Sequence, residues 1–159
     1  MKEYNIAFNT INDQKQLIRF NDTFFNYFSY RTVLPENTLL EVIDWLKNIT
    51  GKKVAVMFGN CQITILQKFF LKNKIFTDQY ILIEIPRVFE YNNPIFVRLF
   101  NENLWSVCDL FISQHVKKDN RWSPLVATHT IPSRLPETAK VVWIQNIYFE
   151  GNFPQYVRN

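Results

Sequence analysis

The feature that most constrains the fold is a regular alternation of helical patterns and short apolar runs that begins at Pro35. Residues 35–51 predict a helix, because Pro and Glu occupy its first turn, an apolar stripe follows, and Gly51 provides a natural stop. Residues 61–73 repeat the amphipathic pattern, and residues 93–105 fit a third helix. Four apolar runs predict strands, namely KKVAVMF, QYILIEI, CDLFISQ and KVVWIQN.

This alternation argues for a parallel sheet with helices on both of its faces. We therefore predict an α/β fold, a three-layer sandwich with a mostly parallel, flavodoxin-like sheet in which the first strand lies between the second and the third. Residues 35–159 would form this domain, and residues 1–34 an N-terminal extension packed on it, in which YNIAF could be a short strand. Residues 115–139 hold three Pro and many polar residues, which predicts a long loop with one short helix at most.

Composition narrows the class of protein. The chain has 159 residues, enough for one ordinary domain, and 47% of them are hydrophobic, which suits a sizeable core. Its formal charge of +4 suits an anionic ligand or indicates no ligand in particular. The Lys and Arg residues are scattered, which disfavours nucleic-acid binding. The two cysteines form neither a metal-ligand spacing nor a disulfide framework. Since no signal-peptide core and no membrane-spanning apolar run is visible, we expect a cytoplasmic protein without a metal or a transmembrane segment.

Polar residues follow three of the four predicted strands. They are Gly59, Asn60, Cys61 and Gln62 after the first strand, Gln114 and His115 after the third, and Gln145 and Asn146 after the fourth. Because the carboxyl ends of parallel strands share one edge of the sheet, where ligands bind as the strand order reverses, we expect these groups to converge on one crevice. The second strand ends in Pro86 and Arg87, which we place at the margin of that crevice.

Cys61 is the sharpest candidate, because it stands where a strand is followed directly by a helix. A helix N-terminus favours the thiolate, which is the nucleophilic form of cysteine, and its N–H groups could bind the oxyanion of an acyl-transfer intermediate. Gly59 would permit the tight turn, and Asn60 could cap the helix or donate a hydrogen bond. The alternative is an unreactive buried cysteine beside a phosphate or carboxylate site. Cys108, which opens a predicted core strand, is expected to be a packing residue.

His115 is the nearest candidate for a catalytic base. We expect it on the same edge of the sheet as Cys61, so a Cys–His pair is geometrically allowed, although a lone loop histidine is more often a solvated surface residue. His129 could reach the same place from the long loop, and a surface role is its alternative too. Asp109, at the start of the third strand, faces the wrong end of the sheet for catalysis.

Candidates for binding a nucleotide cofactor lie in and after the long loop. Arg121, Trp122 and Arg134 could hold phosphate groups and stack on an adenine, or they could simply anchor the loop. Asn146, at the end of the fourth strand, is a further polar candidate at the same edge.

Three motifs, taken in order along the chain, are similar to one known family. VAVMFGNCQ, CDLFISQ and KVVWIQNIYFEGNFPQ resemble the WcbI-like polysaccharide biosynthesis proteins, which carry a GNCQ turn after the first strand, a strand ending in Gln and a later aromatic segment. The resemblance covers roughly residues 52–157. It implies a fold similar to that of SGNH hydrolases, with cysteine in the place of their serine. Family members are longer, and their catalytic histidine is expected after the aromatic segment, so we expect a fragment or a short homologue in which His115 substitutes.

The resemblance implies a bacterial acetyltransferase of capsular or surface polysaccharide biosynthesis, which binds acetyl-CoA and transfers its acetyl group to a sugar hydroxyl. It places Cys61 at the nucleophile position and Gly59, Asn60 and Gln62 in the turn around it. Gln114 lies at the adjacent strand end, where it would help to stabilise the oxyanion. Two alternatives stay open. One is a truncated homologue that binds coenzyme A or a glycan without chemistry, and the other is an esterase-like hydrolase with a cysteine nucleophile.

Overall fold

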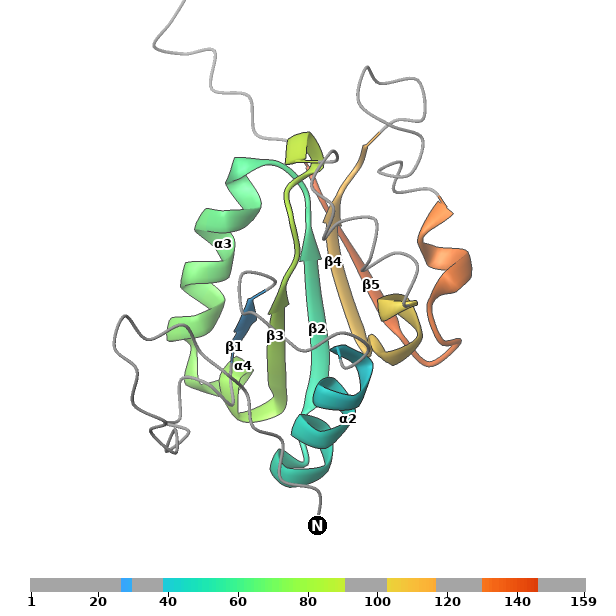
Figure 1. The fold of residues 1–159 in the computed structure, drawn as a ribbon. Helices are drawn as coiled ribbons and strands as arrows, with labels where there is room; N and C mark the ends of the chain where they lie inside the picture. Colours follow the sequence, from blue (N-terminus) through green and yellow to red (C-terminus); the bar gives the residue numbers. More distant parts are fainter. Residues whose placement is uncertain (1–26, 30–38, 91–102, 117–129, 146–159) are drawn as a thin grey trace, which may run out of the picture.

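The centre of the structure, a computed structural model that describes residues 27–29, 39–90, 103–116 and 130–145, is a five-stranded parallel sheet (Figure 1). The strands lie in the order β1-β3-β2-β4-β5. Their bounds are Tyr27–Ser29 for β1, Lys53–Phe58 for β2, Tyr80–Glu84 for β3, Leu110–Gln114 for β4 and Lys140–Ile144 for β5. The first predicted strand, β2, therefore lies between the second, β3, and the third, β4, which confirms the predicted α/β fold with its parallel sheet.

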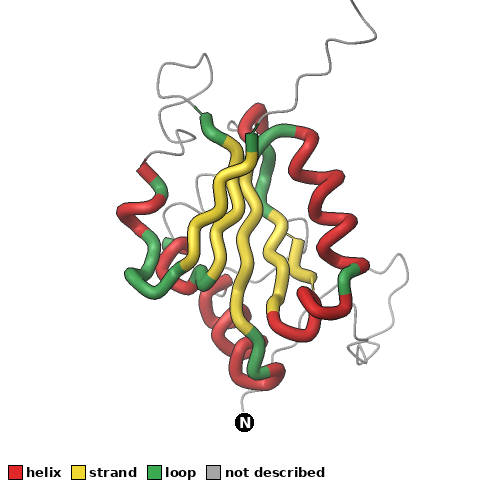
Figure 2. Tube along the Cα trace, turned by 180° about the vertical axis from the view of Figure 1, so that it is seen from behind, coloured by secondary structure: helices red, strands yellow, loops and turns green. Residues whose placement is uncertain are grey.

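The core lies on both faces of the central strand β2. All of its residues after Lys53 are buried, as its lack of polar alternation predicted. On one face, Ala55 and Met57 join a core cluster whose other members come from α3 (Cys61–Lys72), α4 (Lys74–Gln79), β3 and β4. On the other face lie α2 (Leu39–Thr50) and the short helix η2 (Leu104–Val107). Figure 1 and the reverse view in Figure 2 show helices on both sides of the sheet, which gives three layers.

The end of helix α2 agrees with the predicted stop. The Gly51 N–H donates to the Lys47 carbonyl oxygen over 2.8 Å, and Gly51 has a left-handed φ of 66°, the usual geometry after a helix C-terminus. The start of this predicted helix, residues 35–38, lies outside the described residues, as does most of the predicted helix 93–105. In the long predicted loop, the described part contains one short helix, η5 (Pro132–Arg134).

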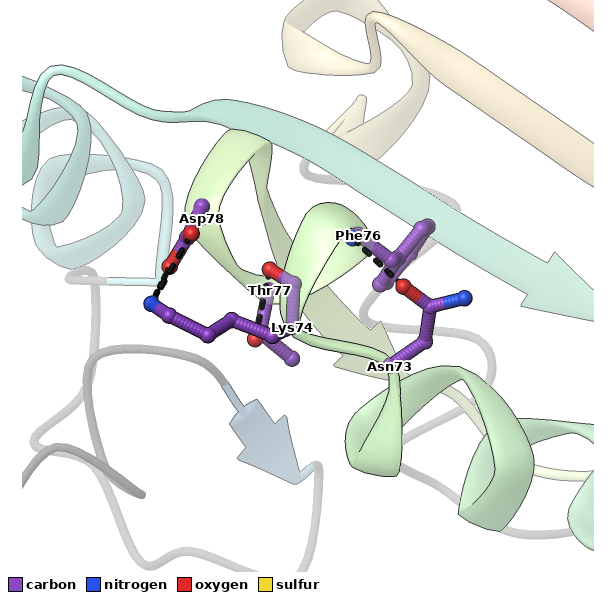
Figure 3. Close-up of polar contacts among 5 residues, drawn as sticks. All are labelled: Asn73, Lys74, Phe76, Thr77 and Asp78. Atoms are coloured by element: carbon purple, nitrogen blue, oxygen red, sulfur yellow. Dashed lines mark hydrogen bonds and ion pairs between the residues drawn. The ribbon is translucent and has the colours of Figure 1, made fainter.

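Among the described strands and α-helices, two were not predicted. Strand β1 falls within the predicted N-terminal extension and pairs in parallel with β3, whereas the YNIAF segment lies outside the described residues. Helix α4 begins at a shared cap, because the Asn73 N–H donates to the Phe70 carbonyl oxygen over 3.0 Å and its side chain accepts from the Phe76 N–H over 3.2 Å (Figure 3). Within α4, Lys74 and Asp78 form an exposed ion pair at 3.0 Å, also drawn in Figure 3.

The amino ends of β2 and β4 are joined by Asp109. Its carboxylate accepts from the Val54 N–H over 2.7 Å and lies 3.3 Å from the Lys47 ammonium nitrogen. Asp109 therefore lies at the end of β4 away from Gln114, in agreement with its predicted position. The neighbouring Cys108 is fully buried, and this burial raises the pKa of its thiol to about 12, as expected of a packing residue.

Candidate functional site

The turn between β2 and α3 presents Cys61 to solvent. Gly59 and Asn60 follow β2, and Cys61 is the first residue of α3 and is exposed. Asn60 caps the helix, because its side-chain oxygen accepts from the Gln62 N–H over 2.9 Å and its carbonyl oxygen accepts from the Ile63 N–H over 3.1 Å. The first turn of α3 contains no acidic residue, so no side-chain carboxylate offsets the positive end of the helix dipole there.

Gln114 lies beneath this turn at the end of the neighbouring strand β4. Its Oε1 accepts from the Asn60 N–H over 2.7 Å, and its Nε2 donates to Gln62 Oε1 over 2.7 Å. Together with the bond from the Gln62 N–H to Asn60 Oδ1, these contacts close a loop of hydrogen bonds that we call the amide ring. The ring bonds the two chain neighbours of Cys61, Asn60 and Gln62, to each other and to Gln114. The structure therefore brings together the predicted turn residues and Gln114.

The amide ring changes which N–H groups of the turn can face a ligand. The N–H groups of Asn60 and Gln62 both donate within the ring, and Gln114 is only 1% exposed. The N–H of Cys61 is the first of the helix, and in the part of the chain that the structure describes nothing accepts from it. An oxyanion at this turn would therefore meet the Cys61 N–H first.

The segment after β3, which was predicted to lie at the margin of the crevice, also contacts the turn. The Val88 N–H donates to the Gly59 carbonyl oxygen over 3.0 Å. Beside it, the Arg87 guanidinium forms an ion pair with Glu90 at 3.1 Å and lies 4.8 Å from the centre of the Phe89 ring. Val88, Phe89 and Glu90 form the short helix η1 (Val88–Glu90), and Arg87 directly precedes it. The signal available in the sequence was Pro86, a residue that cannot continue a central strand and that follows the end of β3 by two residues.

His115 lies on the other face of the sheet from α3. Its ring stacks on Trp143 of β5 at 4.4 Å and 14°, and Trp143 packs edge-on against Phe111. Ile144, which follows Trp143 in β5, packs on the core cluster that α3 covers. Because successive strand residues point to opposite faces, Trp143 lies on the other face. The structure thus places His115 at the predicted edge but shows no contact between it and Cys61.

The predicted nucleotide-binding residues are placed only in part. Arg134 is exposed on η5, in the connection that leads to the amino end of β5. Arg121, Trp122, Asn146 and the further candidate His129 lie outside the described residues. Across the described ranges, no group of three or more His, Cys, Asp and Glu side chains could hold a metal ion. None of the described helices is long and apolar enough to cross a membrane.

A comparison with known protein families identifies one family. The family model for "Polysaccharide biosynthesis enzyme WcbI" matches residues 54–159, whereas no curated protein matches the chain. A similar solved structure is described as WcbI, a novel polysaccharide biosynthesis enzyme, in a native form without a disulfide bond between coenzyme A and one of its cysteines. The similarity has a TM-score of 0.59 and 22% sequence identity, covers 65% of this chain but only 33% of that one, and shows a shared fold. Because the family match spans more than half of its residues, this chain belongs to the WcbI family of polysaccharide biosynthesis enzymes.

Proposed function

We propose that this chain carries the thiol-bearing part of an acetyltransferase of bacterial capsular or surface polysaccharide biosynthesis, with acetyl-CoA as donor and a sugar hydroxyl as acceptor. The observation that carries the proposal is the exposed Cys61 at the amino end of α3, on the carboxyl edge of a parallel sheet. Family membership supports a role in polysaccharide biosynthesis. The similar WcbI structure is described as a native form without a disulfide bond between coenzyme A and a cysteine. That description links coenzyme A to a cysteine in a similar protein, which supports coenzyme A as the ligand beside Cys61.

The proposed chemistry is acyl transfer through Cys61. Acetyl-CoA supplies an acetyl thioester when it is bound. The Cys61 thiolate would attack the thioester carbonyl carbon, and the bond to the coenzyme A sulfur would break, which leaves an acetylated Cys61 and a free coenzyme A thiolate. The sugar hydroxyl would then attack this acetyl group and lose its proton to a base, so that an ester forms and the Cys61 thiolate returns. The Cys61 N–H is the oxyanion donor we propose, because the neighbouring amides already donate within the amide ring.

The described residues fit the reacting end of coenzyme A. An exposed thiol at a helix N-terminus, with no acidic residue in the first turn, suits attack on a thioester, because the positive end of the helix dipole favours the thiolate. For the nucleotide end we propose Arg121, Trp122, Arg134 and Asn146, and the formal charge of +4 is in keeping with an anionic ligand. We also propose a cytoplasmic location, because two cysteines do not make a disulfide framework. The expected likeness to SGNH hydrolases is part of the same proposal.

A second candidate function is a module that binds coenzyme A or a glycan without chemistry. The observation in its favour is the position of His115, which stacks on Trp143 on the face of the sheet away from α3. Among the described residues, no His, Asp or Glu side chain contacts Cys61, so the structure shows no base paired with the thiol. In this case Cys61 would mark the binding site without being acetylated.

The deciding experiment is intact-mass spectrometry after incubation with acetyl-CoA. We expect wild type to gain the mass of one acetyl group and Cys61→Ala to gain none. Cys108→Ala is the matched control, because it removes the buried cysteine and leaves the exposed one, and it should be acetylated like wild type. A saccharide acceptor added afterwards should remove the adduct, whereas removal at the same rate by water alone would identify an esterase-like hydrolase.

A binding measurement separates the remaining outcomes. Titration calorimetry with coenzyme A should show binding to both wild type and Cys61→Ala, because the contacts that we propose for the nucleotide end do not involve the Cys61 sulfur. Binding without any adduct would favour the binding module. The absence of binding to either protein would overturn coenzyme A as the ligand.

A further inference from the structure

We propose that Gln114 is a positioning residue that fixes the Cys61 turn through the amide ring and does not itself bind the reacting oxyanion. The inference rests on the proposed role of Cys61 and deepens it. It differs from the sequence-based expectation, which gave Gln114 a direct part in oxyanion stabilisation. The geometry that supports it is the closed loop of hydrogen bonds through Asn60, Gln62 and Gln114.

The chemistry of the partners fixes the orientation of the Gln114 amide. The Asn60 backbone N–H can only donate, so the Gln114 atom that faces it must be the oxygen. The amide nitrogen of Gln114 must then face Gln62, whose side-chain oxygen accepts from it at 2.7 Å. Reversal of the Gln114 amide would set N–H against N–H at Asn60. The ring therefore has one arrangement, and that arrangement directs both ends of the Gln114 amide at the turn.

Burial keeps the Gln114 amide in this role. Gln114 is 1% exposed, so a ligand at the exposed Cys61 does not reach it without displacing the turn. The strand beneath it is also held, because Ser113 Oγ donates to the Phe58 carbonyl oxygen over 3.0 Å and β2 pairs with β4 in parallel at that point. A buried amide that loses its partners is left with unsatisfied polar atoms, so the ring favours one conformation of the turn.

The test uses variants that open different parts of the amide ring. Gln114→Met removes both of its side-chain bonds at similar length. Gln62→Met removes the bond between the two glutamines and leaves the bond from the Asn60 N–H to Gln114 Oε1 in place. Gln114→Glu is the conservative variant, because its carboxylate still accepts from the Asn60 N–H. Ser113→Ala is the matched control, because it removes a buried hydrogen bond of the adjacent residue and leaves the ring whole.

Two readouts report on the ring without coenzyme A. We expect Gln114→Met to accelerate hydrogen exchange of the Asn60 amide by roughly tenfold or more, and Gln114→Glu to keep it protected. We also expect alkylation of Cys61 by iodoacetamide to slow by roughly two- to tenfold in Gln114→Met, because the sulfur is no longer held at the amino end of α3. Ser113→Ala should leave both rates near those of wild type even where its melting temperature falls.

The outcomes separate positioning from a general structural role. An Asn60 amide that stays protected in Gln114→Met would overturn the proposal. So would an equal loss of Cys61 reactivity in Ser113→Ala. Should Gln114→Met fail to fold, Gln62→Met decides, because it should slow alkylation of Cys61 while the Asn60 amide stays protected, and unchanged alkylation would contradict the ring. Because neither readout needs coenzyme A, a failure of the acetyl-transfer proposal is recognised separately by the mass experiment.

Discussion

Gly59→Ala is the substitution that tests the geometry of the candidate site most directly. A Cβ atom at this position would lie 2.5 Å from Ile63 Cγ1 and 3.0 Å from Gln114 Cδ, and it would also collide with Gln114 Oε1. Both neighbours are buried, at 2% and 1% exposure, so neither can move into solvent. Overpacking of this kind costs about 1–3 kcal/mol, and displacement of the Gln114 oxygen from the Asn60 N–H adds about 1 kcal/mol.

We therefore expect Gly59→Ala to lower the free energy of unfolding by about 2–4 kcal/mol, measured by urea denaturation. Iodoacetamide should also alkylate Cys61 more slowly than in wild type, because the displaced Gln114 opens the amide ring. Thermal and chemical unfolding measured by circular dichroism and by tryptophan fluorescence should agree, since a single domain of this size normally unfolds in one transition.

Gly51→Ala is the matched control, because it strains the chain for a different reason and in a different place. Nothing lies within 4 Å of a Cβ atom at Gly51, but its φ of 66° is left-handed. That strain costs about 1–2 kcal/mol, partly offset by the stiffer unfolded chain, so a net loss of about 1 kcal/mol is expected. Cys61 should react as in wild type. A Gly59→Ala protein within about 0.5 kcal/mol of wild type, or one with unchanged Cys61 reactivity, would refute the reasoning.

Three further substitutions test the surrounding structure. Asn60→Ala removes the cap of α3 and should cost about 1 kcal/mol in urea denaturation, whereas Asn60→Asp keeps the cap and should cost less. Burial raises the pKa of Cys108 from 9.0 to about 12, so the unfolded protein loses this thiol proton at a lower pH than the folded protein. The free energy of unfolding should therefore be unaffected by this group below pH 9 and fall by about 1.4 kcal/mol per pH unit from pH 9 to pH 12. Cys108→Ala should lack this slope. Asp109→Ala should cost about 1–3 kcal/mol by loss of the bond from the Val54 N–H, and leave alkylation of Cys61 unchanged.

The sequence predicted the sheet because its central strands carry a strong local signal. β2 is buried on both faces, so its residues form an unbroken apolar run, and the helices beside it keep their apolar stripes. β1 and α4 lack such a signal, because three and six residues are too few to show a period. For α4 a weaker cue was present in Asn73, a residue type favoured at helix N-caps. For β1 the deciding fact is tertiary, namely an open edge of β3 that accepts a parallel strand.

The features of the candidate site that follow from the order of residues along the chain were predictable. The contacts that other segments make with the turn were not. The turn from Gly59 to Gln62 follows a strand and opens a helix, which spacing alone indicates. The contact from the Val88 N–H to the Gly59 carbonyl oxygen could not be predicted, because it depends on the path of the loop after β3. The orientation of the Gln114 amide likewise follows from its partners in the amide ring, which only the packed structure brings within bonding distance.

The position of His115 shows why the edge of a sheet is too coarse a guide to a catalytic pair. Gln114 and His115 are adjacent, and both lie at the carboxyl end of β4, so a prediction based on the edge alone placed both beside Cys61. Consecutive residues of a strand point to opposite faces, however, and α3 covers only one of them. Gln114 takes the face beneath the Cys61 turn, which leaves His115 to stack on Trp143 across the sheet. A prediction that assigned Phe111, Ile112 and Ser113 to alternate faces of the sheet would also have placed Gln114 and His115 on opposite faces. Only one of those two residues could then lie beside Cys61. In the structure the Gln114 amide lies at the Cys61 turn, and among the described residues no imidazole contacts the Cys61 thiol.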